Sequence, residues 1–398
     1  MTGPVRLSLT PEGVRRLTAR HPWVYRGHLA KGTGEARPGD WVALCDRGRP
    51  LAWGWFGPGA IAVRVLAFQE VPDPLELVRR RLDEALAWRR RWCPDEEAFR
   101  WVHGEGDGLP GLIVDVYGRH ASVQMLVSGW AIRAKVLVEC LLERLPLEGV
   151  VLRNDGKHLE KEGLVREVRL LAGTLPADGT AEARIGSLRQ RVDLMGGQKT
   201  GAYLDVRHWV RPLLERFEGA RVLDAFSYQG HFGLHALAAG AERVVALEQS
   251  DEAVALAVRG RGINALPDRM EWMRGNAFDS LRELERRGDR FDVAVLDPPP
   301  FSPSRGQLEG ARRGYKDLAL RAFRLLEPGG TLLFGSCSHA FSRELLLSTL
   351  EDAARDARAV FRVAGSLGQP ADHPAVGQVP ESDYLKGFLL GVDHERKA

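Results

Sequence analysis

The feature that most constrains the fold is a regular alternation of strand and helix patterns that begins near residue 192. Short apolar runs, each followed by a helical pattern, mark the strands at residues 221–224, 243–248, 292–297 and 331–334. Such alternation is typical of a doubly wound parallel sheet with helices on both faces. We therefore predict an α/β fold whose Rossmann-like C-terminal domain binds its ligands beyond the carboxyl ends of the strands.

The residues before this domain form two smaller regions of different character. Residues 1–70 contain short strand patterns separated by tight turns, which predicts an all-β module. Residues 71–190 begin with a helical pattern between residues 72 and 94 and continue with short strands around a second helix, which predicts a small central α/β domain. The expected domain division is therefore 1–70, 71–190 and 191–398.

The first region combines positive charge with aromatic side chains. It carries ten basic and five acidic residues, a balance of +5, whereas the whole chain has a net charge of +3. Arginine binds phosphate and stacks on bases, so a basic β module rich in aromatic residues has the composition of an RNA-binding barrel. Residues 21–25 (HPWVY) and the turn at residues 38–40 (PGD) resemble a PUA domain, which implies RNA binding by residues 1–70.

Several classes of protein are not expected from this sequence. No apolar run approaches the ~20 residues of a membrane helix, and the first residues lack the basic-then-apolar pattern of a signal peptide. The four cysteines lie far apart without a CxxC pair, so neither a disulfide scaffold nor a structural zinc site is predicted. We expect a cytoplasmic protein without a metal; homodimer formation is left open.

Three loops at the carboxyl ends of consecutive strands form the predicted cofactor site. The first loop lacks the GxGxxG spacing of a pyrophosphate cradle, which argues against NAD or FAD. Glu248 ends the second strand, where a carboxylate can accept both hydroxyls of a ribose. An amide and an apolar wall suited to an adenine edge follow the third strand. The candidate cofactor residues in these loops are Asp224, Phe226, Ser227, Gly230, Glu248, Asn276, Ala277 and Phe278.

Taken in this order, the three loops resemble those of the class I S-adenosylmethionine-dependent methyltransferases, which implies S-adenosylmethionine as the cofactor. The fourth strand ends in residues 297–301 (DPPPF), similar to the D/N-P-P-x motif of class members that methylate bases. In that motif a carboxylate or amide, held by rigid prolines, faces the amino edge of the target. Asp297 is therefore a candidate for cofactor contact and for catalysis.

A cysteine follows the fifth strand, in the run Ser336-Cys337-Ser338-His339. Carbon-5 of a pyrimidine is a poor nucleophile, but a thiolate that adds to carbon-6 makes carbon-5 enamine-like and able to accept a methyl group. A lone cysteine is more often buried and inert. Because the other three cysteines precede this domain and Asp297 ends the fourth strand, Cys337 is the candidate nucleophile.

The whole chain is similar to the RlmI-type bacterial 23S ribosomal RNA cytosine-C5 methyltransferases, which carry a PUA domain. This resemblance implies large-subunit ribosomal RNA as the partner. It also implies that residues 199–207 close over the cofactor. The matching stretches are residues 197–207 (GQKTGAYLDVR), 297–299 (DPP), 336–338 (SCS), 372–374 (DHP) and 384–387 (YLKG), and the implied cofactor contacts are Thr200, Tyr203, Asp205 and Arg207.

The fourth-strand motif holds no second cysteine, so product release must use another group. The base that removes the C5 proton is unassigned, with His339 and Asp205 as candidates. Three other functions stay open: methylation of an exocyclic amine of adenine or guanine, which needs no cysteine; methylation of uracil at C5; and non-catalytic RNA binding in assembly. Replacement of Cys337 by Ala separates amine methylation from C5 methylation.

Overall fold

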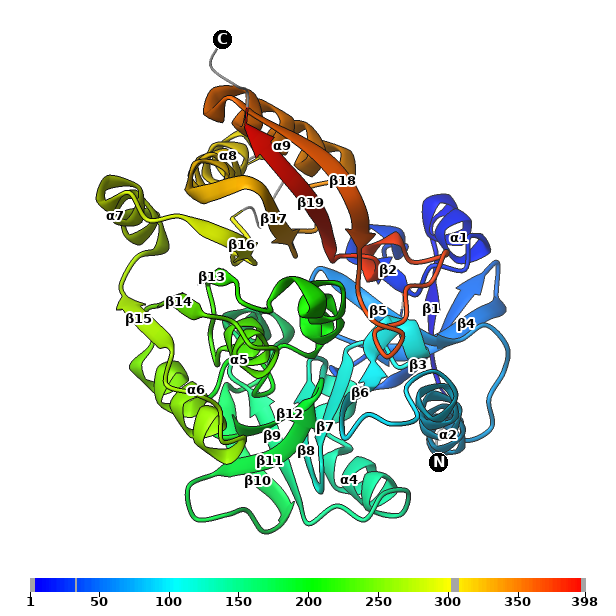
Figure 1. The fold of residues 1–398 in the computed structure, drawn as a ribbon. Coiled ribbons are helices and arrows are strands. Elements are labelled where there is room, and N and C mark those ends of the chain that lie inside the picture. The colour runs from blue at the N-terminus through cyan, green and yellow to red at the C-terminus, as the bar shows by residue number, and fades with distance from the viewer. Residues whose placement is uncertain (1–3, 33, 302–307, 395–398) are drawn as a thin grey trace. The chain divides into compact units, whose positions relative to one another are not determined.

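A computed structural model describes residues 4–32, 34–301 and 308–394 of the chain (Figure 1). The chain divides into two compact units. Unit 1 comprises residues 1–183, 192–204 and 371–383, and unit 2 comprises residues 184–191, 205–370 and 384–398. No helix in the described ranges is long and apolar enough to cross a membrane.

Unit 1 begins with a five-stranded sheet in the order β1-β3-β4-β5-β2. The first helix starts where the Thr10 side chain accepts a hydrogen bond from the main-chain N–H of Gly13, which satisfies one of the free amides of its first turn. The elements are β1 (Val5–Ser8), α1 (Pro11–Thr18), β2 (Trp23–Tyr25), η1 (Arg26–His28), β3 (Trp41–Asp46), β4 (Arg49–Phe56) and β5 (Ile61–Ala67).

A second five-stranded sheet of unit 1 has the order β10-β9-β8-β7-β6. The long helix predicted between residues 72 and 94 is present as α2. The elements are α2 (Pro74–Trp92), β6 (Ala98–His103), η2 (Gly104–Asp107), β7 (Leu112–Tyr117), β8 (His120–Met125), α3 (Ser128–Ala131), α4 (Ala134–Leu142), β9 (Gly149–Asn154), η3 (Lys157–Glu162) and β10 (Glu167–Gly173). A two-stranded sheet of β11 (Thr180–Ile185) and β12 (Leu188–Asp193) follows where the chain passes between the units.

The two five-stranded sheets of unit 1 share one hydrophobic core. Trp55 on β4 lies in the same cluster of buried side chains as Leu82 on α2 and Trp130 on α3. Its ring centroid is 6.0 Å from that of Trp130, and the Arg133 guanidinium lies 4.0 Å from the Trp55 centroid. Because these contacts bury large aromatic surfaces, removal of the first sheet would expose the core of the second.

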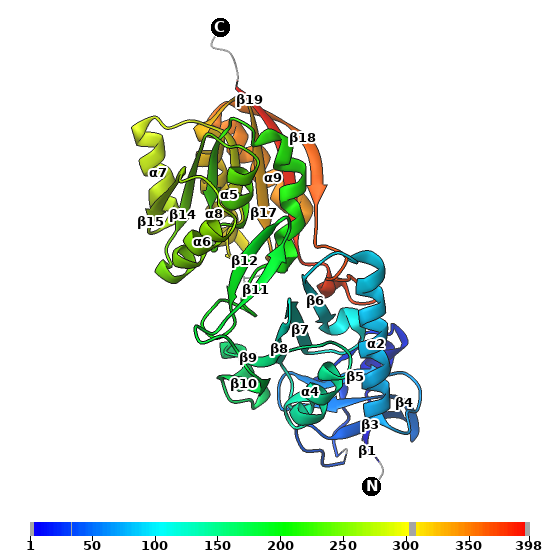
Figure 2. The ribbon, with the colours of Figure 1, turned by 60° about the horizontal axis from the view of Figure 1, so that its bottom comes forward.

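Unit 2 contains a seven-stranded sheet in the order β15-β14-β13-β16-β17-β19-β18, in which β19 is antiparallel to its neighbours. Helices α5 and α6 cover one face, and α7, α8 and α9 pack on the other (Figures 1 and 2). The elements are η4 (Leu204–Arg216), β13 (Arg221–Ala225), α5 (His231–Ala238), β14 (Arg243–Glu248), α6 (Asp251–Ile263), β15 (Met270–Arg274), α7 (Ala277–Arg287), β16 (Phe291–Leu296), α8 (Leu308–Leu325), β17 (Leu326–Ser336), α9 (Arg343–Ala357), β18 (Ala359–Leu367) and β19 (Lys386–His394).

The sequence of unit 2 explains this arrangement. The central strands are continuous runs of Val, Leu and Ala, as expected for strands buried on both faces. Ser250, Asn276 and Ser342 each accept a main-chain hydrogen bond at the start of a helix. The fifth strand, β17, begins at Leu326 rather than at the predicted residue 331, since Leu326 pairs with Phe291 across a bulge.

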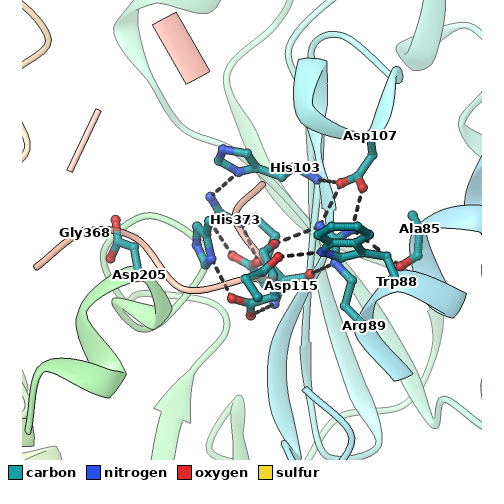
Figure 3. Close-up of polar contacts among 12 residues, drawn as sticks. Ala85, Trp88, Arg89, His103, Asp107, Asp115, Asp205, Gly368 and His373 are labelled. Atoms are coloured by element: carbon teal, nitrogen blue, oxygen red, sulfur yellow. Dashed lines mark hydrogen bonds and ion pairs between the residues drawn. The ribbon is translucent and has the colours of Figure 1, made fainter. Parts of the chain in front are cut away.

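Two segments that flank strands of unit 2 in sequence belong to unit 1 and are held by buried polar contacts. Figure 3 shows the contacts around Arg89 and Asp107 that hold the second of them, residues 371–383. Arg89 makes a bidentate ion pair with Asp107, and its Nη2 donates to the main-chain oxygen of Asp372 at 2.7 Å. The main-chain N–H of Arg100 donates to the Asp372 carboxylate at 2.9 Å. These bonds fix the segment at residues 371–383, which includes η6 (Pro380–Ser382).

Thr200 fixes the other segment, residues 192–204. Its hydroxyl donates to Asp115 Oδ2 at 2.5 Å and lies 3.2 Å from the Tyr117 hydroxyl. Asp115 also accepts two hydrogen bonds from Arg100 at 2.8 Å. The side chain of Thr200 is thus fully engaged within unit 1.

Candidate cofactor and catalytic site

The loop that follows β13 has an unusual backbone. Phe226 and Tyr228 adopt positive φ angles of 63° and 50°, and Gly230 follows at 73° as the N-cap of α5. Left-handed conformations are costly for residues with a side chain and concentrate where a ligand is bound. The N–H of Ser227 donates to the carbonyl of Leu247 at 3.1 Å, which joins this loop to the end of β14.

Asp224 is buried at the end of β13, with 1% of its surface exposed. Its Oδ2 accepts a hydrogen bond from the N–H of Gly233 at 2.8 Å, while its Oδ1 and the buried Ser227 hydroxyl have no hydrogen-bond partner within the described ranges. Burial raises the pKa of Asp224 to about 7, and the nearby charges of Glu248 and Asp297 add to this rise. A buried carboxyl oxygen without a hydrogen-bond partner is suited to bind a polar ligand.

A glycine at position 233 allows helix α5 to approach Asp224 closely. A Cβ atom at this position would lie 2.5 Å from Met270 Cε and 3.1 Å from Asp224 Oδ2. A side chain would therefore displace the Met270 methyl group and crowd the Asp224 carboxylate. The hydrogen bond that orients Asp224 depends on this close packing.

Glu248 is the last residue of β14, and main-chain amides orient its carboxylate. Oε2 accepts from the N–H of Tyr228 at 2.8 Å. Oε1 accepts from Gln249 at 2.9 Å and from Ser250 at 2.8 Å. This carboxylate therefore links the loop after β13 to the loop after β14, where the sequence predicted a ribose contact.

We expect replacement of Glu248 by Ala to weaken S-adenosylmethionine binding by about 1.5 to 3 kcal/mol, the range for loss of a hydrogen bond to a charged group. Isothermal titration calorimetry measures this change. Glu252→Ala is a matched control, because Glu252 lies exposed at the start of α6, where it accepts from Ser250. Equal affinities for wild type and Glu248→Ala would remove Glu248 from the site.

The loop after β15 carries the residues that the sequence predicts to contact adenine. Asn276 caps α7, and its Oδ1 accepts from the N–H of Phe278 at 2.9 Å. The ring of Phe278 lies 5.9 Å from that of Phe301, and the Phe301 ring lies 4.8 Å from that of Tyr315. Ala277 and Phe278 are half-buried, so this apolar wall is partly accessible.

Asp297 directly follows β16, and its carboxylate lies against the end of the neighbouring strand β17. A Cβ atom on Gly335 would lie 2.9 Å from Asp297 Oδ1 and 2.5 Å from the Trp209 ring. Only glycine at this position permits the observed approach. Asp297 thus lies against Gly335, which precedes Cys337 by two residues, and both sites are at the carboxyl ends of the adjacent strands β16 and β17.

Cys337 is half-buried, whereas Cys45, Cys93 and Cys140 are buried. A tyrosine on α8, Tyr315, is close enough to feel the charges of both Cys337 and Asp297. The pKa of Tyr315 is raised to about 12, mainly by burial and in part by the charges of Cys337 and Asp297. The structure thus brings the two predicted catalytic residues together.

The predicted residues at positions 200–207 divide between the two units. Thr200 and Tyr203 belong to unit 1, where the Tyr203 hydroxyl donates to Gln198. Asp205 and Arg207 are buried in unit 2. Asp205 Oδ2 accepts a hydrogen bond from the Tyr384 hydroxyl at 2.8 Å.

Tyr384 also connects the two candidate bases. Its ring centroid lies 5.6 Å from that of His339, so Asp205, Tyr384 and His339 form a contiguous chain within unit 2. Two further residues contact the chain around Cys337: Tyr315 bonds Ser336, and Lys386 bonds the main chain of Ser338. The sequence alone gave none of these three residues a role, although Tyr384 and Lys386 lie in the stretch 384–387 that resembles the family. The signal for Tyr315 was its place in the apolar stripe of α8.

Two regions of the chain match known protein families. Residues 7–68 match the PUA-like domain, and residues 173–389 match the S-adenosylmethionine-dependent methyltransferases. Ribosomal RNA large subunit methyltransferase I from Cronobacter sakazakii is 36% identical over 98% of this chain and 99% of its own length. The protein of the same name from Salmonella arizonae is 36% identical over 97% of both chains. The chain belongs to the ribosomal RNA large subunit methyltransferase I family.

Solved structures share the fold of this family member. A methyltransferase from Streptococcus mutans matches with a TM-score of 0.81 and 17% identity, over 97% of this chain and all of its own. A methyltransferase in complex with S-adenosylhomocysteine gives the same values. The predicted α/β methyltransferase fold is thereby confirmed, and S-adenosylmethionine is the cofactor. The vacant Asp224 oxygen and Ser227 hydroxyl, together with the oriented Glu248, fit this ligand.

Proposed function

We propose that this family member methylates carbon-5 of a cytosine in large-subunit ribosomal RNA through a covalent adduct with Cys337. The observation that carries the proposal is the accessible Cys337 beside Asp297, at the ends of β17 and β16. The relatives' printed name supports ribosomal RNA as the substrate. The cytoplasm is the proposed place of action.

The chain's own residues perform most of the proposed reaction. The Asp297 carboxyl group binds the N3/N4 edge of a cytosine that has left its stack, and the proton that it shares with N3 draws electron density from the ring and makes carbon-6 more electrophilic. The Cys337 thiolate then adds to carbon-6, and the electron pair displaced from the C5=C6 bond makes carbon-5 nucleophilic. S-adenosylmethionine supplies the methyl group as an electrophilic sulfonium.

Release of the product requires a base. Removal of the C5 proton restores the C5=C6 double bond as the C6–S bond breaks and the thiolate leaves. Asp205 is a candidate base, since its carboxylate already accepts a hydrogen bond from Tyr384. His339 is the second candidate; it is exposed and lies in the same loop as Cys337.

The PUA-like domain is proposed to bind the RNA. A hollow of about 450 Å³ on it is lined by Glu12, Arg15, Arg16, Tyr25 and His28. Arg15 is exposed, and the Arg16 guanidinium lies 5.5 Å from the centroid of the Tyr25 ring. Cationic side chains next to an accessible aromatic ring suit a phosphate and a stacked base.

Arg15→Ala should weaken RNA binding. It should also make the plot of log K against log salt concentration less steep by ~0.7 to 0.9, which is the contribution of one phosphate contact. Cofactor binding should not change. Fluorescence anisotropy with a ribosomal RNA fragment at several salt concentrations measures this slope. Arg286→Ala on α7 is the control with the same charge change. A slope equal to that of wild type would mean that Arg15 makes no phosphate contact.

Substitution of Arg15 is preferable to deletion of residues 1–70, because that deletion would expose the hydrophobic core that the two sheets of unit 1 share.

A further inference from the structure

Lys386 is a buried lysine next to the proposed nucleophile. It is the first residue of β19, where it pairs with Ser336 of β17, and only 7% of its surface is exposed. Its ammonium Nζ donates to the main-chain oxygens of Ser338 at 2.7 Å and of Phe341 at 2.8 Å. One side chain therefore closes the turn that follows Cys337.

The residue before Cys337 is fixed in a different way. The Ser336 hydroxyl donates to the Tyr315 hydroxyl at 2.8 Å and accepts from the N–H of Ser338 at 3.3 Å. Tyr315 in turn bonds the main chain of Phe301 in the loop after β16. Both serines that flank Cys337 are buried, while the cysteine itself is half-buried. The turn is thus rigid on both sides of an accessible thiol.

The use of a buried lysine to close a turn has a free-energy cost, because its ammonium group loses contact with water. Lysine is almost never fully buried without a partner, because removal of an ammonium group from water is costly. A neutral amide such as glutamine could donate to the same two carbonyl oxygens without that cost. Lys386 therefore adds to the turn what a neutral donor would not, a positive charge next to the main chain of Ser338.

We propose that Lys386 is a positioning residue for the reaction: it holds the Ser338–Phe341 turn and places a buried positive charge beside the Cys337 thiol. This inference rests on the proposed function, in which the thiolate is the attacking species. The distance between this charge and the thiol is limited by the chain itself. The ammonium bonds Ser338, the residue next to Cys337, and consecutive Cα atoms are ~3.8 Å apart.

Charges of both signs surround the turn. At a separation of about 10 Å and an effective dielectric constant of about 20, one positive charge increases the thiolate fraction roughly tenfold near neutral pH. The Asp297 carboxylate opposes this effect. Among the described residues, the titratable groups near the turn include Asp297 after β16, Tyr315 on α8, His339 within the turn, Tyr384 just before β19 and Lys386 at its start.

The test measures the reactivity of the thiol in the full chain, without RNA or cofactor. Iodoacetamide alkylation of Cys337 is followed by mass spectrometry across neutral and alkaline pH, and Cys337→Ser gives the background from the three buried cysteines. Lys386→Gln keeps N–H donors for both carbonyls but removes the charge. We expect this variant to react roughly tenfold more slowly near neutral pH and to approach the wild-type rate at alkaline pH.

Lys386→Arg, which keeps the charge, should follow the wild-type pH profile. Lys386→Met provides a second neutral variant, should Lys386→Gln be poorly folded, and is expected to shift the profile in the same direction. Neutral variants whose alkylation profiles coincide with that of wild type, or that are slowed equally at every pH, would overturn the proposal. Because alkylation needs no methyl transfer, this result is independent of whether Cys337 proves to be the nucleophile in the methylation assay.

Discussion

Replacement of Cys337 by Ala should reduce cytosine-C5 methylation by roughly 10³-fold or more, because loss of a covalent nucleophile removes the route by which carbon-5 becomes reactive. Cofactor binding should be retained, since Cys337 follows β17 and the proposed cofactor loops follow β13, β14 and β15. Methyl transfer to ribosomal RNA, followed by mass spectrometry of the nucleosides, measures both rate and product. Cys45→Ala, which alters a buried thiol of the PUA-like domain, is the matched control.

The same cysteine should become trapped on a modified substrate. RNA that carries 5-fluorocytosine at the target position should form an adduct stable to denaturant, because fluorine cannot be removed as a proton and elimination stops. The adduct should require both Cys337 and S-adenosylmethionine. Formation of 5-methylcytosine by Cys337→Ala at a near-normal rate would falsify the mechanism.

Other products would point to the alternative functions. Methylated adenine or guanine that persists in Cys337→Ala would indicate an exocyclic-amine enzyme, for which the Asp297-Pro298-Pro299 motif is sufficient. 5-Methyluracil would indicate the uracil enzyme, which uses the same covalent route. If wild-type protein methylates no RNA, a non-catalytic role in binding or assembly becomes the better explanation.

Much of the unit 2 fold was predictable, because its determinants are local. Continuous Val and Leu runs identify β13, β14 and β16 as buried parallel strands, and Ser or Asn caps identify the helices between them. Strands β16 and β17 are adjacent in the sheet, as expected of the fourth and fifth strands of a doubly wound fold. The final pair β18 and β19 was not predicted; residues 359–367 alternate irregularly and are half-exposed at the sheet edge, which gives a weak strand pattern.

Other features could not be predicted because they depend on contacts between residues distant in sequence. Thr200 bonds Asp115, 85 residues earlier, and Arg100 bonds Asp372, 272 residues later. No periodicity in a single sequence encodes such pairs. The same holds for Lys386, which comes to lie beside the turn after Cys337 only because β19 pairs with β17.

The cofactor and catalytic roles of the predicted residues stay predictions. Asp224, Glu248, Asp297 and Cys337 all lie in unit 2 at the ends of neighbouring strands.

Asp297→Asn should lower the methylation rate by roughly 10²- to 10⁴-fold, while leaving the thiol of Cys337 at least as reactive as in wild type. The two effects have opposite signs because Asp297 has two electrostatic consequences. Its carboxylate is proposed to bind the cytosine edge, so the amide variant loses transition-state stabilisation. Its negative charge also disfavours the thiolate, so the neutral variant should alkylate with iodoacetamide as fast as wild type, or faster, near neutral pH.

The control for this prediction lies on the same strand. Asp292→Asn removes a carboxylate from the opposite end of β16, where it pairs with Arg221 in a half-exposed ion pair. Such a pair contributes about 1 kcal/mol or less to stability, and methylation should be unchanged. Single-turnover methylation and alkylation are measured on the same preparations. A parallel loss of methylation and alkylation in Asp297→Asn would mean that Asp297 maintains the turn carrying Cys337 and does not bind the base. Direct contact between Asp297 and the cytosine would instead lower the methylation rate and leave the reactivity of the thiol unchanged or higher.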